Sequence, residues 1–235
     1  MHTIKTHANL LLLIILTVLA TVLLEHSQLD VDISQMFYAN GHWLLEKGAQ
    51  PYQFIFYDAP KRLLIGLGLY LLLTLLWRYW HSRQSRPSVT PPYLFTVMST
   101  LSNRDIGYLL LVIILVPTIT ATLKSITHVS CPNHLYIFGG DLPYLNIWQN
   151  MLAKTDTKCF PAAHASGGFA LYGLAYLPSL ARHRVKIFVL VTILGWIMGV
   201  YKMSFGDHFF SHTLVSMLLA WTIACALANK RVTNV

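Results

Sequence analysis

The chain contains few charged residues. Asp, Glu, Lys and Arg make up 11% of its 235 residues, against about 25% in an ordinary soluble domain. This scarcity excludes a soluble globular enzyme. Cysteine is also scarce, because three cysteines are too few for a disulfide scaffold and an odd number leaves at least one thiol unpaired. Hydrophobic residues make up 55% of the chain, and this composition indicates a polytopic membrane protein.

Acidic residues are outnumbered by basic ones. Nine Asp and Glu against seventeen Lys and Arg give a formal net charge of +8. Such an excess alone would fit a nucleic-acid-binding protein, but the basic residues do not form one patch along the chain. We therefore expect no nucleic-acid partner, and a lipid bilayer as the environment.

Six apolar runs are candidates to cross a bilayer core of roughly 30 Å, which takes about 20 mostly apolar helical residues. They cover residues 8–24, 63–80, 106–122, 165–180, 187–201 and 209–228. Lys5 precedes the first run, but no small-x-small cleavage site follows Leu24, so we interpret this run as an uncleaved anchor. The predicted fold class is all-α, a polytopic membrane protein with six transmembrane helices.

The basic residues lie mainly in the loops on one side of this six-helix arrangement. That side holds ten Lys and Arg opposed by Asp105 alone, and the other side holds seven Lys and Arg with eight acidic residues. The ten are Lys5, Arg78, Arg83, Arg86, Arg104, Arg182, Arg184, Lys186, Lys230 and Arg231. Because basic loops are retained in the cytoplasm, both termini are predicted to be cytoplasmic.

The opposite side carries the unusual segments. Residues 25–62 are rich in aromatics, including Phe56 and Tyr57, which we expect to anchor the chain at the membrane interface; a re-entrant segment that admits a lipid is the alternative. Residues 123–168 are too many for a simple connector, which predicts a structured extracytoplasmic loop between the third and fourth helices. This loop and residues 201–212 hold ionisable groups, which next to a membrane are candidates for function.

Three segments resemble the type 2 phosphatidic acid phosphatase superfamily, whose motifs run K-x6-R-P, P-S-G-H and S-R-x5-H-x3-D. They align with residues 124–132, 161–164 and 201–212, and the matching residues are Lys124, Pro132, Pro161, His164 and His208. The departures are Cys131 for Arg, Ala162 for Ser, Ala163 for Gly, Lys202 for Arg and His212 for Asp. The resemblance spans about residues 106–228 and implies a single membrane-embedded domain over residues 1–235.

The resemblance also implies catalytic roles. His208 would attack phosphorus to form a phosphohistidine, His164 would protonate the leaving group, and water would then release phosphate. The family's Asp orients the nucleophile, and His212 lies four residues after His208 on the same helical face. An imidazole stabilises an imidazolium less than a carboxylate does, so we expect slower turnover or support from Asp207 or Asp141.

A phosphate dianion needs cations and N–H donors around it. Lys124 is the expected phosphate cation, and Lys202 keeps the charge of the family's Arg without its bidentate fork. Pro161 suits the first turn of a helix, whose free N–H groups at Ala162, Ala163 and His164 would form an anion cradle.

Two of the three cysteines flank the motifs. Cys131 and Cys159 lie in the same predicted extracytoplasmic loop, where an oxidising compartment permits a bridge, and we predict that they pair. Such a bridge would hold Lys124 and His164 in a common site and contribute roughly 3 to 4 kcal/mol. Two unrelated thiols are the alternative. Cys225, inside the sixth run, is expected to be a buried packing residue.

A zinc site is an alternative interpretation of the same residues. His208 and His212 have the i, i+4 spacing of a zinc-binding pair, and Asp141, His128 or His134 could complete it. No HExxH or CxxC pattern supports this alternative. We therefore place it below the phosphatase, for which we expect no metal and no cofactor.

Together these patterns predict a metal-independent lipid phosphatase in a bacterial inner membrane, with its active site facing the periplasm. By family resemblance, candidate substrates are undecaprenyl diphosphate, lipid A phosphates, phosphatidylglycerol phosphate and phosphatidic acid. A phosphotransferase between lipids is an alternative. The five motif departures motivate another, a catalytically impaired relative that binds phospholipid headgroups or a partner.

Overall fold

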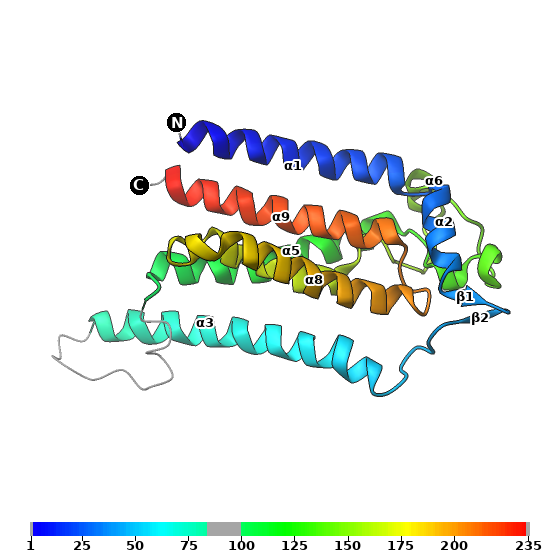
Figure 1. Cartoon of the computed structure of the whole chain (residues 1–235), viewed down its shortest axis with the longest axis horizontal. Helices are drawn as coiled ribbons and strands as arrows, with labels where there is room; N and C mark the ends of the chain where they lie inside the picture. The colour runs from blue at the N-terminus through cyan, green and yellow to red at the C-terminus, as the bar shows by residue number, and fades with distance from the viewer. Residues whose placement is uncertain (1, 84–99, 234–235) are drawn as a thin grey trace.

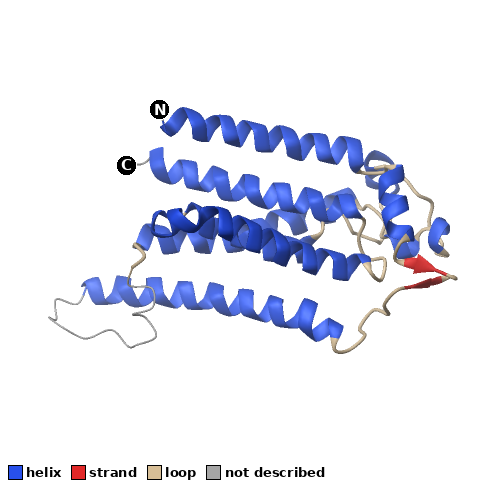
Figure 2. Cartoon of the chain, in the orientation of Figure 1, coloured by secondary structure: helices blue, strands red, loops and turns tan. Residues whose placement is uncertain are grey.

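Five long helices lie side by side in the computed structural model, which describes residues 2–83 and 100–233. They are α1 (His2–Leu24), α3 (Ala59–Arg83), α5 (Asn103–Thr127), α8 (Arg184–Met203) and α9 (Phe210–Thr233). Figure 1 shows both termini at one end of this bundle. Helices dominate the described chain, and the strands shown in Figure 2 form one short hairpin, β1 (Tyr38–Ala39) paired with β2 (His42–Trp43). Such helices satisfy their backbone hydrogen bonds internally, as an apolar environment requires.

Four helical segments of the described chain are long and apolar enough to cross a membrane. These are Phe54–Arg83, Asn103–His134, Pro178–Met203 and Phe210–Lys230. Asn9–Leu24 and α2 (Gln28–Gln35), bent by 75° relative to each other, add a fifth if they count as one span. An all-α membrane protein is therefore confirmed, whereas the six spans stay a prediction.

The fourth apolar run, 165–180, is not one continuous α-helix. It folds as α7 (Ala163–Phe169) followed by two 3-10 segments, η4 (Ala170–Tyr176) and η5 (Pro178–His183). Pro178 lacks the N–H that a continuing helix would need. Glycines allow close packing instead, since a Cβ on Gly168 would lie 2.7 Å from the sulfur of Met198, and one on Gly195 would lie 2.2 Å from the ring of Phe169. Hydropathy therefore located a buried apolar segment but not its conformation.

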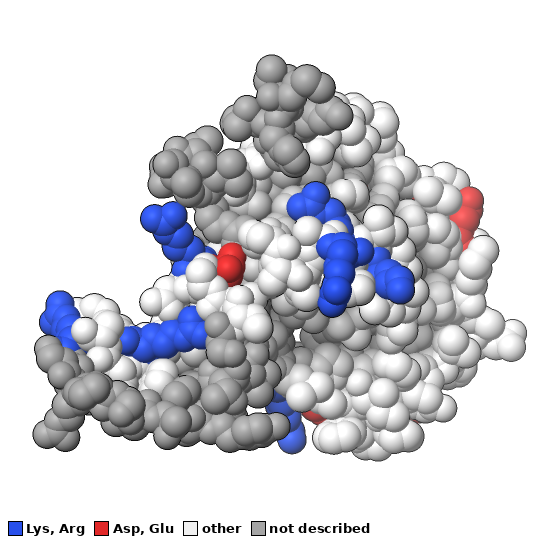
Figure 3. Space-filling model, turned by 60° about the vertical axis from the view of Figure 1, so that its left-hand side comes forward, with Lys and Arg blue, Asp and Glu red and all other residues white. Residues whose placement is uncertain are grey.

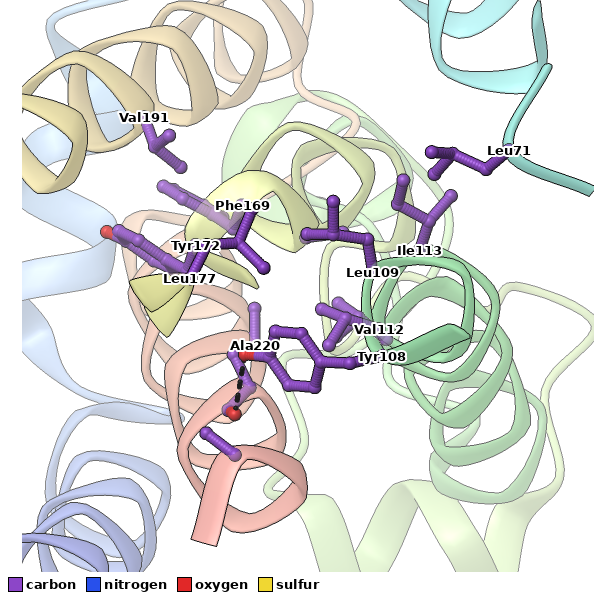
Figure 4. Packing of buried hydrophobic residues seen from close by; sticks show 14 of the residues in the cluster. Leu71, Tyr108, Leu109, Val112, Ile113, Phe169, Tyr172, Leu177, Val191 and Ala220 are labelled. Carbon is purple, nitrogen blue, oxygen red and sulfur yellow. Dashed lines mark hydrogen bonds between the residues drawn. The ribbon is translucent and has the colours of Figure 1, made fainter. Parts of the chain in front are cut away.

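The hydrophobic core lies between α5, α7 with η4, α8 and α9. Figure 4 shows Leu109, Val112, Phe169 and Tyr172 packed together there, with Leu71 of α3 approaching from the other side. The hydroxyl of Tyr108 donates to the carbonyl of Ala224 at 3.0 Å, which links α5 to α9 inside this core. The core fixes the helices that flank the three motif segments.

Loops and short elements gather at the end opposite the termini (Figure 1). They include η1 (Phe54–Asp58) and, between α5 and α7, η2 (Pro132–His134), η3 (Tyr136–Phe138) and α6 (Ile147–Ala153). The loop after β2 and the short helix η2 both hydrogen-bond to the connection between α8 and α9. The N–H of Leu45 donates to the carbonyl of Ser204, and the N–H of Asn133 donates to that of Gly206, both at 3.0 Å. The segment between α5 and α7 is thus structured, and its extracytoplasmic placement stays a prediction.

Basic side chains gather at the end that carries the termini, as Figure 3 shows. α3 ends at Arg83 and α8 begins at Arg184, and Arg104 and Lys230 lie near the corresponding ends of α5 and α9. Arg86 lies outside the described residues. This charge asymmetry fits the predicted cytoplasmic placement of both termini, which the structure itself does not assign to a compartment.

Candidate active site

The three motifs, far apart in sequence, meet at the loop end of the bundle. Lys124 lies in the last turn of α5, and His164 is the second residue of α7. Lys202 lies near the end of α8, and His208 lies in the connection to α9. The side chains of these four residues line one cavity of about 740 Å³. The structure thus brings the predicted cations and both predicted catalytic histidines together.

The nucleophile candidate His208 is buried beside His212. The two Nδ1 atoms lie 3.4 Å apart, within hydrogen-bonding range of each other. Burial, followed by the nearby His212, Lys124 and Lys202, lowers the pKa of His208 well below its usual range. His208 is therefore neutral at pH 7, as a nitrogen nucleophile must be.

His164 is held by an aromatic contact and a backbone acceptor. Its Nε2 lies 3.0 Å from the carbonyl oxygen of Phe56, so Nε2 carries the proton. Its ring stacks on Tyr57 at 4.3 Å between centroids, and the Nζ of Lys202 lies 4.6 Å from the centroid of the same Tyr57 ring. Phe56 and Tyr57, which lie in the segment expected to anchor the chain at the interface, contact His164 and belong to the site. No sequence signal links them to His164, which lies 108 residues from Phe56.

Asp207 binds lysines. Its carboxylate lies 2.9 Å from the Nζ of Lys202 and 3.2 Å from that of Lys47. Asp207, predicted to support the nucleophile, instead holds Lys202, the residue predicted to bind phosphate. Lys47, Lys61 and Lys158 also line the cavity, so five lysines and one aspartate among the described residues face it. Sequence analysis missed these three lysines, which lie outside the motifs.

The predicted anion cradle is wrong for Ala162. Its N–H donates to the carbonyl of His212 at 3.1 Å, and α7 begins only at Ala163. Pro161 thus precedes the helix instead of occupying its first turn. Ala163 does line the cavity. The bond from Ala162 links the second motif to the third, which is a structural role.

Asp141 is not brought to the site. It is exposed in a tight turn after Gly139, which has a φ of 78°, and its N–H donates to the carbonyl of His134 at 3.0 Å. His134 is also exposed, and Nδ1 of His128 lies 2.9 Å from the carbonyl of Thr155. Within residues 2–83 and 100–233, no group of three or more His, Cys, Asp or Glu is placed to hold a metal ion. The zinc alternative thus gains no third ligand.

Cys131 and Cys159 form a disulfide in the structure, with their Cα atoms 5.2 Å apart. This is the pairing that the sequence predicts. Both cysteines line the cavity, so the bridge lies at the site itself. Cys225 is buried and free in α9, again as expected.

Apolar helices around a buried histidine pair and a lysine-lined cavity define a helical membrane protein with a basic cavity at one end. The family model of the PAP2 superfamily matches residues 105–235, and the chain therefore belongs to this superfamily. PAP2 proteins are generally phosphatases, which supports a phosphoric ester hydrolase. Searches of curated proteins and of solved structures gave no match.

Acid should destabilise the fold through His164. Burial, then Lys202 and Lys61, lowers its pKa from 6.5 to about 4, against the opposing effect of the hydrogen bond to Phe56. Below pH 6.5, His164 becomes protonated in the unfolded chain but stays neutral in the folded chain. The free energy of unfolding is therefore highest above pH 6.5 and falls as the pH approaches 4. At pH 4.5 the loss is roughly 2 to 3 kcal/mol.

The measurement is unfolding in detergent at pH 7.5 and pH 4.5, for the wild type and His164→Gln. Glutamine keeps a donor for the Phe56 carbonyl but does not titrate. We expect the variant to lose less stability than the wild type on acidification. An equal loss in both proteins would contradict a buried neutral His164.

Proposed function

We propose that the protein dephosphorylates a membrane lipid phosphate or diphosphate through a phosphohistidine at His208, without a metal. The observation that carries this proposal is the composition of the cavity. One end holds His164, His208 and the lysines, and the other is an apolar groove between α3 and α5, lined by Leu64, Leu69, Leu72, Leu110, Ile114 and Pro117 among others. A ligand with an anionic head and a long apolar tail matches both ends.

The histidine pair supports the attack on phosphorus. Nδ1 of His208 faces Nδ1 of His212 at 3.4 Å, so a proton held on Nδ1 of His208 and donated to His212 would leave the lone pair on Nε2 for the attack. Lys124, and Lys202 held by Asp207, would bind the phosphate oxygens and stabilise the charge that develops in the transition state. As Nε2 then forms its bond to phosphorus, the bond from phosphorus to the leaving oxygen breaks.

His164 completes the reaction as acid and then as base. Its Nε2–H donates to the backbone carbonyl of Phe56, so Nδ1 is the nitrogen available to the leaving group. Because a bound phosphate dianion favours the imidazolium, substrate binding would raise the pKa of His164 from about 4 toward neutrality. The proton of Nδ1 would pass to the leaving oxygen, and His164 would later accept a proton from the water that hydrolyses the phosphohistidine.

The topology proposed with this function has six spans, with residues 165–180, which fold as parts of α7, η4 and η5, as the broken fourth. Both termini would face the cytoplasm of a bacterial cell, and the cavity would face the periplasm through the inner membrane. The charge asymmetry between the two ends of the bundle supports this orientation. The chain would then act as one membrane-embedded domain on lipids of the outer leaflet.

Phosphate release from a panel of lipids tests the function. The purified protein would be assayed in mixed micelles with undecaprenyl diphosphate, a lipid A phosphate, phosphatidylglycerol phosphate and phosphatidic acid, each with and without EDTA. We expect release from at least one lipid, unchanged by EDTA. Binding without release would point to an impaired relative, transfer to a second lipid to a phosphotransferase, and loss with EDTA to a metal enzyme.

The groove between α3 and α5 gives a more specific prediction. Gly68 lines the cavity, and a Cβ there would lie 3.8 Å from Ile113, so the Phe of Gly68→Phe would extend into the groove without a backbone clash. We expect kcat/KM for a long-chain lipid phosphate to fall about tenfold or more. Activity on a water-soluble phosphate ester should be unchanged.

Gly66→Phe is the matched control for Gly68→Phe. Gly66 lies one half-turn away on the same helix and is exposed, and a Cβ there would meet nothing within 4 Å. This variant should act on both substrates as the wild type does. Equal losses of lipid activity in the two variants would count against the groove as the tail site.

A further inference from the structure

A lysine from outside the motifs binds the carboxylate that holds Lys202. The Nζ of Lys47 lies 3.2 Å from one oxygen of Asp207, and the Nζ of Lys202 lies 2.9 Å from the other oxygen. Lys47 and Lys202 both line the cavity that also contains Lys124 and His208. One carboxylate therefore holds two ammonium groups, from distant parts of the chain, at the same cavity.

The formal charges of these three residues show what Lys47 adds to the site. Lys202 stands where the family motif has Arg, and the adjacent carboxylate of Asp207 cancels its charge. Lys47 leaves the three groups with one net positive charge, which is the charge that the motif arginine would carry alone. Without Lys47, Lys202 and Asp207 would present a neutral pair to a phosphate dianion, which is attracted by positive potential.

Two lysines also supply more donors than one. A guanidinium binds phosphate through two parallel N–H groups, whereas a single ammonium acts as a point charge. Each ammonium has three N–H donors, and its bond to Asp207 uses one of them. Lys47 and Lys202 therefore retain donors that can bind different oxygens of the same phosphate group.

The backbone places Lys47 beside the third motif. The N–H of Leu45 donates to the carbonyl of Ser204 at 3.0 Å. The ring of Trp43 packs on Gly206, where a Cβ would lie 2.4 Å from a ring carbon. The segment that carries Lys47 is thus tied at two points to the connection between α8 and α9, on which Asp207 lies.

The ion pair between Lys47 and Asp207 does little for the stability of the fold. The side chain of Lys47 is 71% exposed, whereas those of Asp207 and Lys202 are 13% exposed. Exposed ion pairs contribute little to the free energy of unfolding, because water screens them. The same exposure leaves the ammonium of Lys47 accessible to an anion that enters the cavity.

We propose that Lys47 is a phosphate-binding residue of the active site, which together with Lys202 replaces the charge and the paired donors of the motif arginine. This inference rests on the proposed function, since the ligand is the phosphate group of the substrate. Asp207 then holds the two ammonium groups together at the cavity.

The test measures binding of inorganic phosphate to the purified protein in detergent, at low ionic strength. Bound phosphate raises the melting temperature, and a concentration series gives the dissociation constant. Lys47→Met keeps an unbranched side chain and removes the charge. We expect the dissociation constant to rise about tenfold or more, because a charge-assisted hydrogen bond is lost. The kcat/KM for the best lipid substrate should fall by a similar factor.

Arg62→Met is the matched control. Arg62 lies in the first turn of α3, at the same end of the molecule, and is an exposed cation that is not among the residues lining the cavity. It should bind phosphate within about twofold of the wild type, because water and salt screen its charge. A Lys47→Met protein that binds phosphate as tightly as Arg62→Met would overturn the inference. A wild type that neither binds phosphate nor releases it from any lipid would instead count against the proposed function.

A double variant separates charge from folding. Adding Asp207→Asn to Lys47→Met removes the carboxylate that cancels the charge of Lys202, so one net positive charge returns. We expect phosphate affinity to recover in large part, short of the wild type by the donors of Lys47. A double variant that binds phosphate as weakly as Lys47→Met would show that the loss reflects the folding of this segment, and the inference would be wrong.

Discussion

Replacing His208 with alanine is expected to lower phosphate release by a factor on the order of 10⁴ or more. The imidazole is the group proposed to bond to phosphorus, and it lies in the cavity with Lys124, Lys202 and His164. Removing a covalent nucleophile leaves only binding and charge stabilisation by the lysines. The measurement is the initial rate of phosphate release, with thermal unfolding as the check that the variant is folded.

His134→Ala is the matched control for this variant, because His134 is exposed in the loop before Gly139 and is not among the residues lining the cavity. It removes the same side chain from the same end of the molecule and should leave the rate within about twofold of the wild type. A His208→Ala protein that kept a tenth of the wild-type rate would rule out His208 as the nucleophile.

Replacing Asp30 with alanine should destabilise the fold and reduce activity together. Asp30 of α2 is buried, and its carboxylate accepts hydrogen bonds from the backbone N–H of Ser211, at 2.8 Å, and from the Ser211 hydroxyl. Ser211 lies in the first turn of α9, next to His212. Losing two hydrogen bonds to a buried charged acceptor costs roughly 3 kcal/mol or more, and the start of α9 would no longer be fixed.

The measurement for Asp30→Ala is the melting temperature in detergent together with kcat. Asp32→Ala is the control, since Asp32 lies on the same short helix but is exposed and accepts from the Gln28 side chain at 2.8 Å. We expect Asp32→Ala to melt and turn over as the wild type does. An Asp30→Ala protein with an unchanged melting temperature would show that α2 does not hold the site.

The sequence predicted the parts of the site that its own motifs carry. Lys124, His164 and His208 could be placed together because each lies where an apolar run ends, and the predicted topology brings those ends to one side. The bridge between Cys131 and Cys159 followed from their positions beside two of the motifs. These predictions depend on the order and spacing of residues, which hydropathy and motif patterns preserve.

Other parts depend on contacts that leave no such pattern. The stacking of Tyr57 on His164 joins residues over a hundred positions apart, which come together only in the folded chain. The N–H of Ala162 donates to the carbonyl of His212, and no sequence propensity predicts this hydrogen bond. The 3-10 geometry of η4 could not be predicted either, because hydropathy reports only that the run is apolar.

The covalent intermediate tests the central claim most directly. The purified protein would be mixed with its best lipid substrate, quenched within milliseconds in alkali, which preserves phosphohistidine, and digested for mass spectrometry. The account predicts one phosphorylated peptide, modified at His208 and absent from His208→Ala. Steady phosphate release without a phosphohistidine at His208, or with the phosphoryl group on another residue, would contradict it.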